Sequence, residues 1–140
     1  MPDSMYFKDW LDKANNDLLA AEAILAYYEE PPTDTICYHC HQVAEKCCKA
    51  FLIAKANKLH KIHEIVELLE FCIAIDKDFE IFRASTENLN RFYIDAKYPP
   101  GFPVLYPIEE AKTAVDQARE IIAFTRKKLI TDQSEEAKNE

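Results

Sequence analysis

The chain has 140 residues, a formal net charge of −8 and an apolar content of 49%. This length suits one domain with a single core. The lone glycine, Gly101, excludes glycine-rich phosphate loops and dinucleotide fingerprints, and the negative charge argues against a broad basic face for nucleic acid, so any contact with RNA would have to be local.

The first part of the chain predicts two long helices, because apolar residues recur at steps of three and four. The first helix is expected over roughly residues 4–29. Pro31 and Pro32 then interrupt the pattern. The second helix is expected to start near Thr33, because Thr33, Asp34 and Thr35 offer side chains suited to an N-cap.

Three further helices are expected after this pair. A third carries Ile62, Ile65, Leu69 and Cys72 on one face, and a fourth extends from near Phe82 to Ala96, before two consecutive prolines. The charges at the two ends of the fifth predicted helix interact favourably with the helix dipole. This helix opens with two acidic residues and closes with three basic ones, namely Glu109, Glu110, Arg126, Lys127 and Lys128.

No segment shows the alternation of a strand, and the prolines fall between the periodic segments. We therefore predict an all-α fold, an up-and-down antiparallel bundle of four to five helices that spans residues 1–130. Residues 131–140, "TDQSEEAKNE", are too polar to pack and are predicted to form an acidic disordered tail.

The sequence also predicts the compartment. No segment has the apolar length of a membrane span, and "MPDSMYFKDW" lacks the basic start and apolar run of a signal peptide. The five cysteines are odd in number and four lie within residues 37–48, which favours reduced thiols over a disulfide framework. We expect a soluble, cytoplasmic protein with no membrane partner.

The second helix carries a narrow polar stripe of Gln42, Glu45, Lys46 and Lys49 at i, i+3, i+4 and i+7. One interpretation is a solvated surface with a Glu45–Lys49 ion pair. The other is a face for a ligand or a partner. No acidic residue stands between Glu45 and Glu64, and lysines accumulate there with His60 and His63, a plausible seat for phosphates.

Metal and nucleophile motifs are weak. "CYHCH" and "HKIHE" contain ligand types, but no second CxxC exists, so buried thiols and surface imidazoles are favoured over a structural metal. The serines have no neighbouring histidine and no elbow motif. We predict no metal and no cofactor.

Four motifs together resemble the HEPN domain family: "WLDKANNDLLAAEAIL", "CHQVAEKCCKAFL" with its polar stripe, "KIHEIVELL" and "LNRFYIDAKYP". The resemblance extends from Trp10 to Leu129. It implies an all-α bundle that forms a homodimer. It also implies, for many short prokaryotic members, a toxin–antitoxin pair with a minimal nucleotidyltransferase, or a metal-independent endoribonuclease.

The ribonuclease motif of that family is an arginine, four to six residues and a histidine, often followed two places on by a tyrosine. On this chain it fits Arg91, with Ala96 at the place of the histidine, then Lys97 and Tyr98. No other pair supplies the motif, because the first arginine is Arg83 and the last histidine is His63. Alanine accepts no proton, so the mechanism fails here unless Tyr98, Lys97 or a distant histidine substitutes.

Two functions follow. The first is a non-catalytic homodimer that binds a nucleotide or phosphate through Arg91, Lys97, Tyr98, Lys46 and Lys49. In this hypothesis Gln42 and Glu45 lie on the face that binds the nucleotidyltransferase, and Tyr98 is the candidate for modification. The second is an endoribonuclease toxin with a degenerate motif, acting on RNA. A structural interpretation stays open beside them: Arg91 pairs with Glu87 or Asp95, and Tyr98 caps the bundle.

Overall fold

The computed structural model describes residues 3–96 and 105–138, with side chains for 3–93 and 105–130. Within these ranges the chain forms five α-helices, a 3-10 segment and no strand. The helices are α1 (Phe7–Tyr27), α2 (Thr33–Ala56), α3 (Ile65–Ile75), α4 (Arg83–Ala96) and α5 (Ile108–Lys138), with the 3-10 segment η1 (Lys77–Phe82) before α4. The predicted all-α bundle is confirmed.

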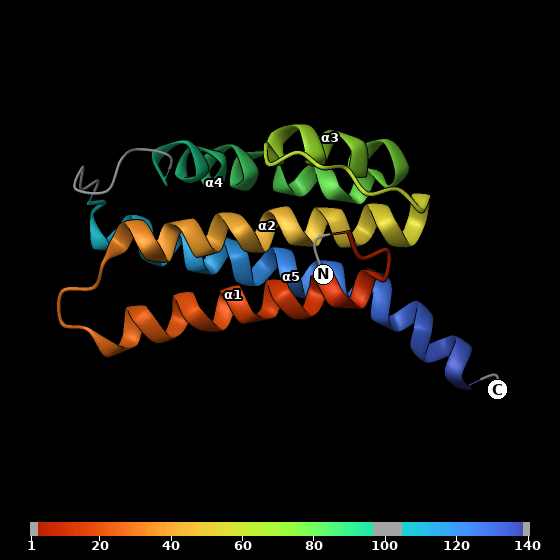
Figure 1. Ribbon diagram of the computed structural model, residues 1–140, viewed down its shortest axis with the longest axis horizontal. Coiled ribbons are helices and arrows are strands. Elements are labelled where there is room, and N and C mark those ends of the chain that lie inside the picture. The colour runs from red at the N-terminus through yellow and green to blue at the C-terminus, as the bar shows by residue number, and fades with distance from the viewer. Residues whose placement is uncertain (1–2, 97–104, 139–140) are drawn as a thin grey trace.

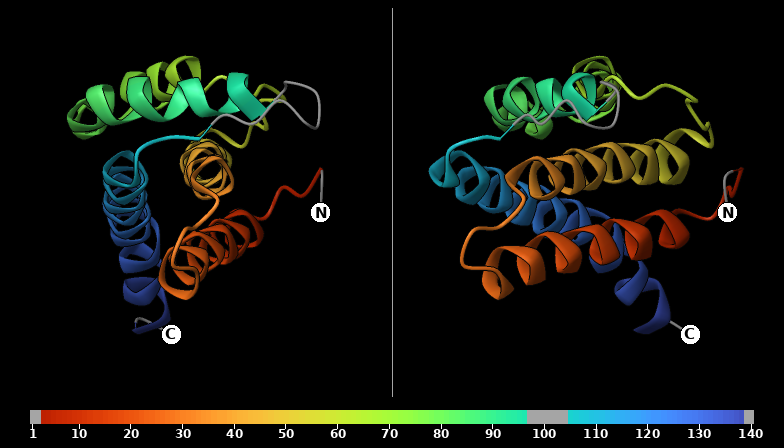
Figure 2. Two further views of the ribbon diagram at one scale, coloured as in Figure 1. Left: turned by 90° about the vertical axis from the view of Figure 1, so that its left-hand side faces the viewer. Right: turned by 60° about the vertical axis from the view of Figure 1, so that its left-hand side comes forward.

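The second helix, α2, lies at the centre of the bundle. It packs against α1 and α5 on one side and against α3 and α4 on the other (Figures 1 and 2). Apolar side chains and cysteines are buried along its whole length, from Ile36 to Ile53. A helix enclosed on several sides cannot keep a broad polar face, so charged residues in its buried middle need partners inside the bundle.

The first helix behaves as its apolar stripe predicts. Its buried residues lie on one face, at steps of three and four, and contact α2 and α5: they are Phe7, Trp10, Leu11, Ala14, Leu18 and Ala21. Burial of such a stripe removes apolar surface from water and is the main stabilising force of the bundle. The helix itself is shorter at both ends than the predicted range.

The second helix, α2, starts at Thr33 as predicted, but without the predicted side-chain cap. Its N-cap is Pro32, and no side chain caps it. The Thr33 hydroxyl instead donates a hydrogen bond to the Tyr106 carbonyl oxygen at 2.9 Å and accepts one from the Tyr106 amide at 2.8 Å. Thr33 therefore fastens the segment before α5 to the start of α2. The N-cap rule failed because a tertiary contact occupies the hydroxyl.

The C-cap of α2 is Asn57, which has an unusual backbone conformation. Asn57 has left-handed backbone angles, φ 52° and ψ 41°, and its amide donates to the Ile53 carbonyl oxygen at 3.0 Å. Helices often end in this conformation on glycine, and asparagine tolerates it better than most residues. The turn leads into a loop, residues 57–64, that carries Lys58, His60, Lys61 and His63 before α3.

The fifth helix continues past the predicted end of the bundle. It begins with Glu109 and Glu110 in its first turn, as expected, but includes residues through Lys138. Its last turns extend away from the other helices (Figure 1). The side chains of residues 131–138 lie outside the described part, so the predicted disorder of the tail stays a prediction. No helix among the described residues is both long and apolar enough to cross a bilayer.

Candidate functional site

Arg91 lies on α4 and is held between α4 and α5. Its Nη2 donates to Glu110 Oε1 at 2.7 Å, and its Nε donates to Asn88 Oδ1 at 3.2 Å. The guanidinium carbon lies 4.4 Å from the centroid of the Phe92 ring, within cation–π range. The prediction that Glu87 or Asp95 pairs with Arg91 did not anticipate Glu110, which is distant in sequence.

A shallow cavity of about 170 Å³ adjoins this guanidinium, lined by Asn88, Arg91, Glu109, Glu110 and Thr113. Arg91 and Glu110 side chains are each 39% exposed, so both reach solvent. Two carboxylates share the cavity with one guanidinium. An incoming phosphate would therefore compete with Glu110 for Arg91, since Arg binds phosphate and carboxylate in the same geometry.

The rest of the motif is beyond the side chains that the structure describes. Ala96 is the last residue of α4, and Lys97 and Tyr98 lie in the segment between the described ranges. The prediction that Arg91, Lys97 and Tyr98 face one ligand is therefore untested. The same holds for Tyr98 as a cap and as a modified residue.

The polar stripe of α2 does not form a solvated surface. Glu45 and Lys49 are each only 4% exposed. Lys49 Nζ lies 3.1 Å from Glu45 Oε2, so the predicted ion pair exists, but inside the bundle. Lys49 also lies 5.6 Å from the centroid of the Trp10 ring on α1. Lys49 is thus enclosed by a carboxylate and an indole rather than open to a ligand.

The other two residues of the stripe, Lys46 and Gln42, contact residues outside the Glu45–Lys49 pair. Lys46 Nζ lies 2.5 Å from Asp17 Oδ2 on α1, and Gln42 Nε2 donates to the Tyr38 hydroxyl oxygen at 2.6 Å. Lys46 and Lys49 therefore pair with different carboxylates, Asp17 and Glu45. Arg91 pairs with a third, Glu110 of α5. Of the predicted phosphate-binding set, the three members with described side chains, Arg91, Lys46 and Lys49, contact different partners.

Asp17 connects α1 and α2. Its Oδ1 lies 2.9 Å from His39 Nδ1, while Lys46 holds its other oxygen. Burial by itself would raise the pKa of the Asp17 carboxyl, but hydrogen bonds from His39 and Lys46 outweigh it and lower the pKa below its ordinary value. We call His39, Asp17 and Lys46 the Asp17 cluster.

A second cluster surrounds Glu45. Glu45 Oε1 lies 3.1 Å from Nδ1 of His63, in the loop between α2 and α3. The His63 ring stacks on Tyr93 of α4, with 5.3 Å between centroids. Glu45 and His63 are 18 positions apart in sequence, so no local pattern predicted their contact. We call His63, Glu45 and Lys49 the Glu45 cluster.

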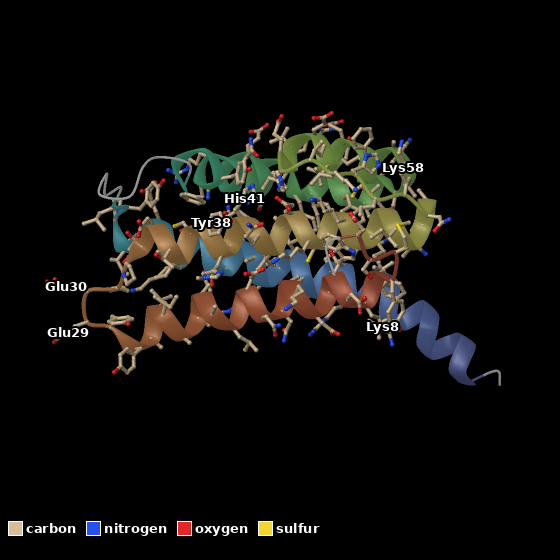
Figure 3. The ribbon with its side chains drawn as sticks, in the orientation of Figure 1. Lys8, Glu29, Glu30, Tyr38, His41 and Lys58 are labelled. Atoms are coloured by element: carbon tan, nitrogen blue, oxygen red, sulfur yellow. The ribbon has the colours of Figure 1, made fainter. Side chains whose placement is uncertain are left out.

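His41 lies on the other side of Tyr93, at 5.1 Å between ring centroids, and is completely buried. Figure 3 labels it on the side of α2 that faces α4. Neither of its ring nitrogens has a hydrogen-bond partner among the described residues. Burial lowers the pKa of His41 to about 4. The expectation of surface imidazoles is wrong for this residue.

The cysteines offer no reactive thiol. All five are free and buried, which agrees with the predicted reduced state. Burial raises the pKa of the Cys37 thiol to about 12 and raises those of Cys40 and Cys47 as well. The thiolate is the nucleophile, so these side chains are inert near neutral pH. Within the described part of the chain, no group of three His, Cys, Asp or Glu residues could hold a metal ion.

Known proteins share this architecture. The family model described as the HEPN domain matches residues 7–129. The crystal structure of TT1696 from Thermus thermophilus superposes with a TM-score of 0.70 at 27% identity, covering 88% of this chain and 98% of that one. ST0689, described as an archaeal HEPN homologue, gives 0.67 at 22% identity, covering 88% and 97%. No curated protein sequence matches.

Proposed function

The chain belongs to the HEPN domain family, and on that premise we propose that it is a non-catalytic module that binds nucleotides or phosphate and pairs with a minimal nucleotidyltransferase. The pair would work as a toxin–antitoxin-like system in the cytoplasm. The observation that carries the binding part is Arg91, a partly exposed guanidinium fixed by Asn88 and Glu110 beside a small cavity.

Arg91 is suited to a phosphate because its orientation is already fixed. The Asn88 hydrogen bond and the Phe92 ring hold the guanidinium plane, so less conformational freedom is lost when an anion binds. Glu110 is exposed enough to move aside. Charge-assisted hydrogen bonds to a phosphate would then take the place of the bond to the carboxylate.

Calorimetric titration with mononucleotides and inorganic phosphate tests this binding. Arg91→Ala should weaken binding by roughly 10–100-fold, the loss expected for a hydrogen bond to a charged group. Arg83→Ala is the matched control, because Arg83 begins the same helix and pairs with exposed glutamates, Glu70 and Glu80. An unchanged affinity in Arg91→Ala would remove Arg91 from the binding site.

The non-catalytic part rests on Ala96. A methyl group accepts no proton, so the motif cannot assist attack by a ribose 2′-hydroxyl. We expect no cleavage of a mixed-sequence labelled RNA by the purified protein in the presence of a chelator. Ala96→His should restore cleavage if the motif is otherwise intact. Cleavage by the unaltered protein that Arg91→Ala abolishes would establish the alternative, an endoribonuclease with a degenerate motif.

The homodimer is a proposal supported by exposed apolar side chains on one part of the bundle. Phe71 and Ile75 of α3 are 37% and 46% exposed, and Ile81 of η1 is 68% exposed. Patches of this kind often mark interfaces. Sedimentation should give a dimer at micromolar concentration and a monomer after Ile81→Glu. A monomer of the unaltered protein at that concentration would refute the dimer.

The nucleotidyltransferase partner and the modification of Tyr98 rest on the family resemblance. Co-expression with a minimal nucleotidyltransferase should yield a complex, and mass spectrometry should find a nucleotidyl group on the peptide that contains Tyr98. Tyr98→Phe should lose that group, whereas Tyr93→Phe should keep it. A nucleotidyl group absent from the unaltered protein would refute the modification.

A further inference from the structure

His63 differs from the other histidines in how it is held. His41 is buried and stacks on Tyr93, His39 is mostly covered in the Asp17 cluster, and His60 stacks on Phe71 at 4.3 Å between centroids. The His63 side chain is 54% exposed, yet Glu45, only 5% exposed in its side chain, anchors its Nδ1. Among the described histidines, His63 combines a buried carboxylate on one nitrogen with access to solvent.

The contact with Glu45 determines the tautomer of His63. An ionised carboxylate only accepts hydrogen bonds, so Nδ1 of His63 carries the proton and donates it to Glu45 Oε1. Nε2 of the neutral ring therefore holds the free electron pair. Lys49 occupies Oε2 of the same carboxylate, and Tyr93 packs against the ring face. These contacts restrict the ring on its anchored side, while 54% of the side chain is exposed to solvent.

We propose that His63 is a phosphoryl acceptor, modified on Nε2 by an acyl phosphate or a related phosphoric anhydride. Histidine forms covalent intermediates in this way when a neighbouring group positions it. This inference goes beyond the proposed function, because it involves neither Arg91 nor the ribonuclease motif. Glu45 is the positioning residue, since it contacts the imidazole and not the phosphoryl donor.

The step is balanced without a further reactant. The Nε2 electron pair attacks phosphorus, an N–P bond forms, and the bond from phosphorus to the carboxylate of the acyl phosphate breaks. That carboxylate leaves with the bonding pair. The proton stays on Nδ1, where the Glu45 carboxylate stabilises the positive charge that develops on the ring, as a carboxylate does for the imidazolium of a catalytic triad.

The loop that carries His63 holds two lysines, which favour an anionic phosphoryl donor over a neutral acyl donor. Lys58 and Lys61 flank His60 in the loop, and Figure 3 shows Lys58 at the end of the bundle where this loop begins. Asp3 pairs with Lys61 while both side chains are more than 70% exposed, so that pair is weak. Lys58 and Lys61 give this loop positive charge that attracts an anionic donor, although Glu64, next to His63, opposes them in part.

The purified full-length protein, treated with acetyl phosphate, provides the test. We expect one phosphoryl group per chain, labile to acid and stable to base, located on His63 by peptide mass spectrometry and by ³¹P NMR. His63→Ala should lose the group and His60→Ala should keep it. His60 is a matched control, because it belongs to the same loop while its ring stacks on Phe71.

The ratio of the phosphorylation rates of His63 and His60 tests the role of Glu45 without a substitution in the core. In the folded protein we expect His63 to react at least about tenfold faster, equivalent to about 1.4 kcal/mol in the barrier. In concentrated urea the ratio should approach one, because the Glu45 contact is lost. A ratio near one in the folded protein, phosphorylation of His60 alone, or no phosphorylation would each overturn the proposal.

Discussion

The Asp17 cluster and the Glu45 cluster have the same composition, a histidine, a carboxylate and a lysine, but different environments. In the Asp17 cluster all three side chains are partly covered, at 27% for His39, 13% for Asp17 and 21% for Lys46. In the Glu45 cluster the carboxylate and the lysine are 5% exposed in their side chains, and the histidine is 54% exposed.

The difference shows that burial decides what such a cluster does. The Asp17 cluster joins two helices at their surface, where water shares the solvation of each charge. The Glu45 cluster keeps an ion pair inside the bundle, where each charge depends on the other. Removing one partner should therefore have a larger effect in the Glu45 cluster. Substitutions at Glu45 and Asp17 test this contrast, and a third prediction, on the buried His41, extends it to pH.

Glu45→Ala should give the largest loss of stability. It leaves Lys49 buried without a carboxylate, and breaking a buried pair in this way costs about 3–5 kcal/mol. Urea unfolding followed by circular dichroism measures the free energy. Glu64→Ala, at an exposed position in the adjoining loop, should change it by less than about 0.5 kcal/mol. The double variant Glu45→Leu/Lys49→Leu should recover most of the loss; a similar loss from both glutamate variants would show that burial is not decisive.

Acid should destabilise the side of α2 that faces α4 before it affects the Asp17 cluster. Between pH 6.5 and about 4 the unfolded chain binds a proton on His41 and the folded chain does not, so stability falls by about 3 kcal/mol as the pH falls through this interval. Below pH 4 both states bind the proton and this loss ends. The lowered pKa of Asp17 acts in a different interval, because its stabilisation is present above pH 3.8 and is lost as the pH falls below it.

Thermal unfolding from pH 7 to pH 4 checks the assignment to His41. His41→Phe keeps an aromatic ring beside Tyr93 and removes the titrating group, so the fall in stability over this interval should become shallower by about 3 kcal/mol in total. An equal fall in both proteins would show that His41 is not the group responsible.

Asp17→Asn should have the smallest effect of the three. It keeps the size of the side chain and weakens two charge-assisted hydrogen bonds, for a loss of about 1–2 kcal/mol. The loss should shrink in high salt, because the cluster is partly open to solvent. Urea unfolding at low and high ionic strength measures both quantities. A loss as large as that of Glu45→Ala would remove the distinction between the clusters.

The fold could be predicted from the sequence because its signals are local. The apolar steps from Phe7 to Ala21 specify one buried face of α1, and the same periodicity places Cys40 and Cys47 in the core. Helix boundaries were less accurate. The start of α2 at Thr33 was predicted correctly, but its side-chain cap was not, because the Thr33 hydroxyl contacts Tyr106, which lies 73 positions away.

The candidate site was only partly predictable. Arg91 was identified from its motif, but its partner Glu110 comes from the next helix, 19 positions away. The stripe of Gln42, Glu45, Lys46 and Lys49 was recognised as one face, yet the structure assigns its members to different neighbours. A helical spacing gives the direction of each side chain and not the element that covers it.

By itself the sequence determined that this chain forms a bundle of helices, that its thiols lie inside it, and that alanine stands where the family motif has histidine. These follow from periodicity, residue type and order along the chain. Only the tertiary structure decided that Glu45 and Lys49 are enclosed and that His63 is anchored while it remains open to water. The reason is physical: the state of a charge depends on what excludes water around it, and here residues from three helices and a loop do so together.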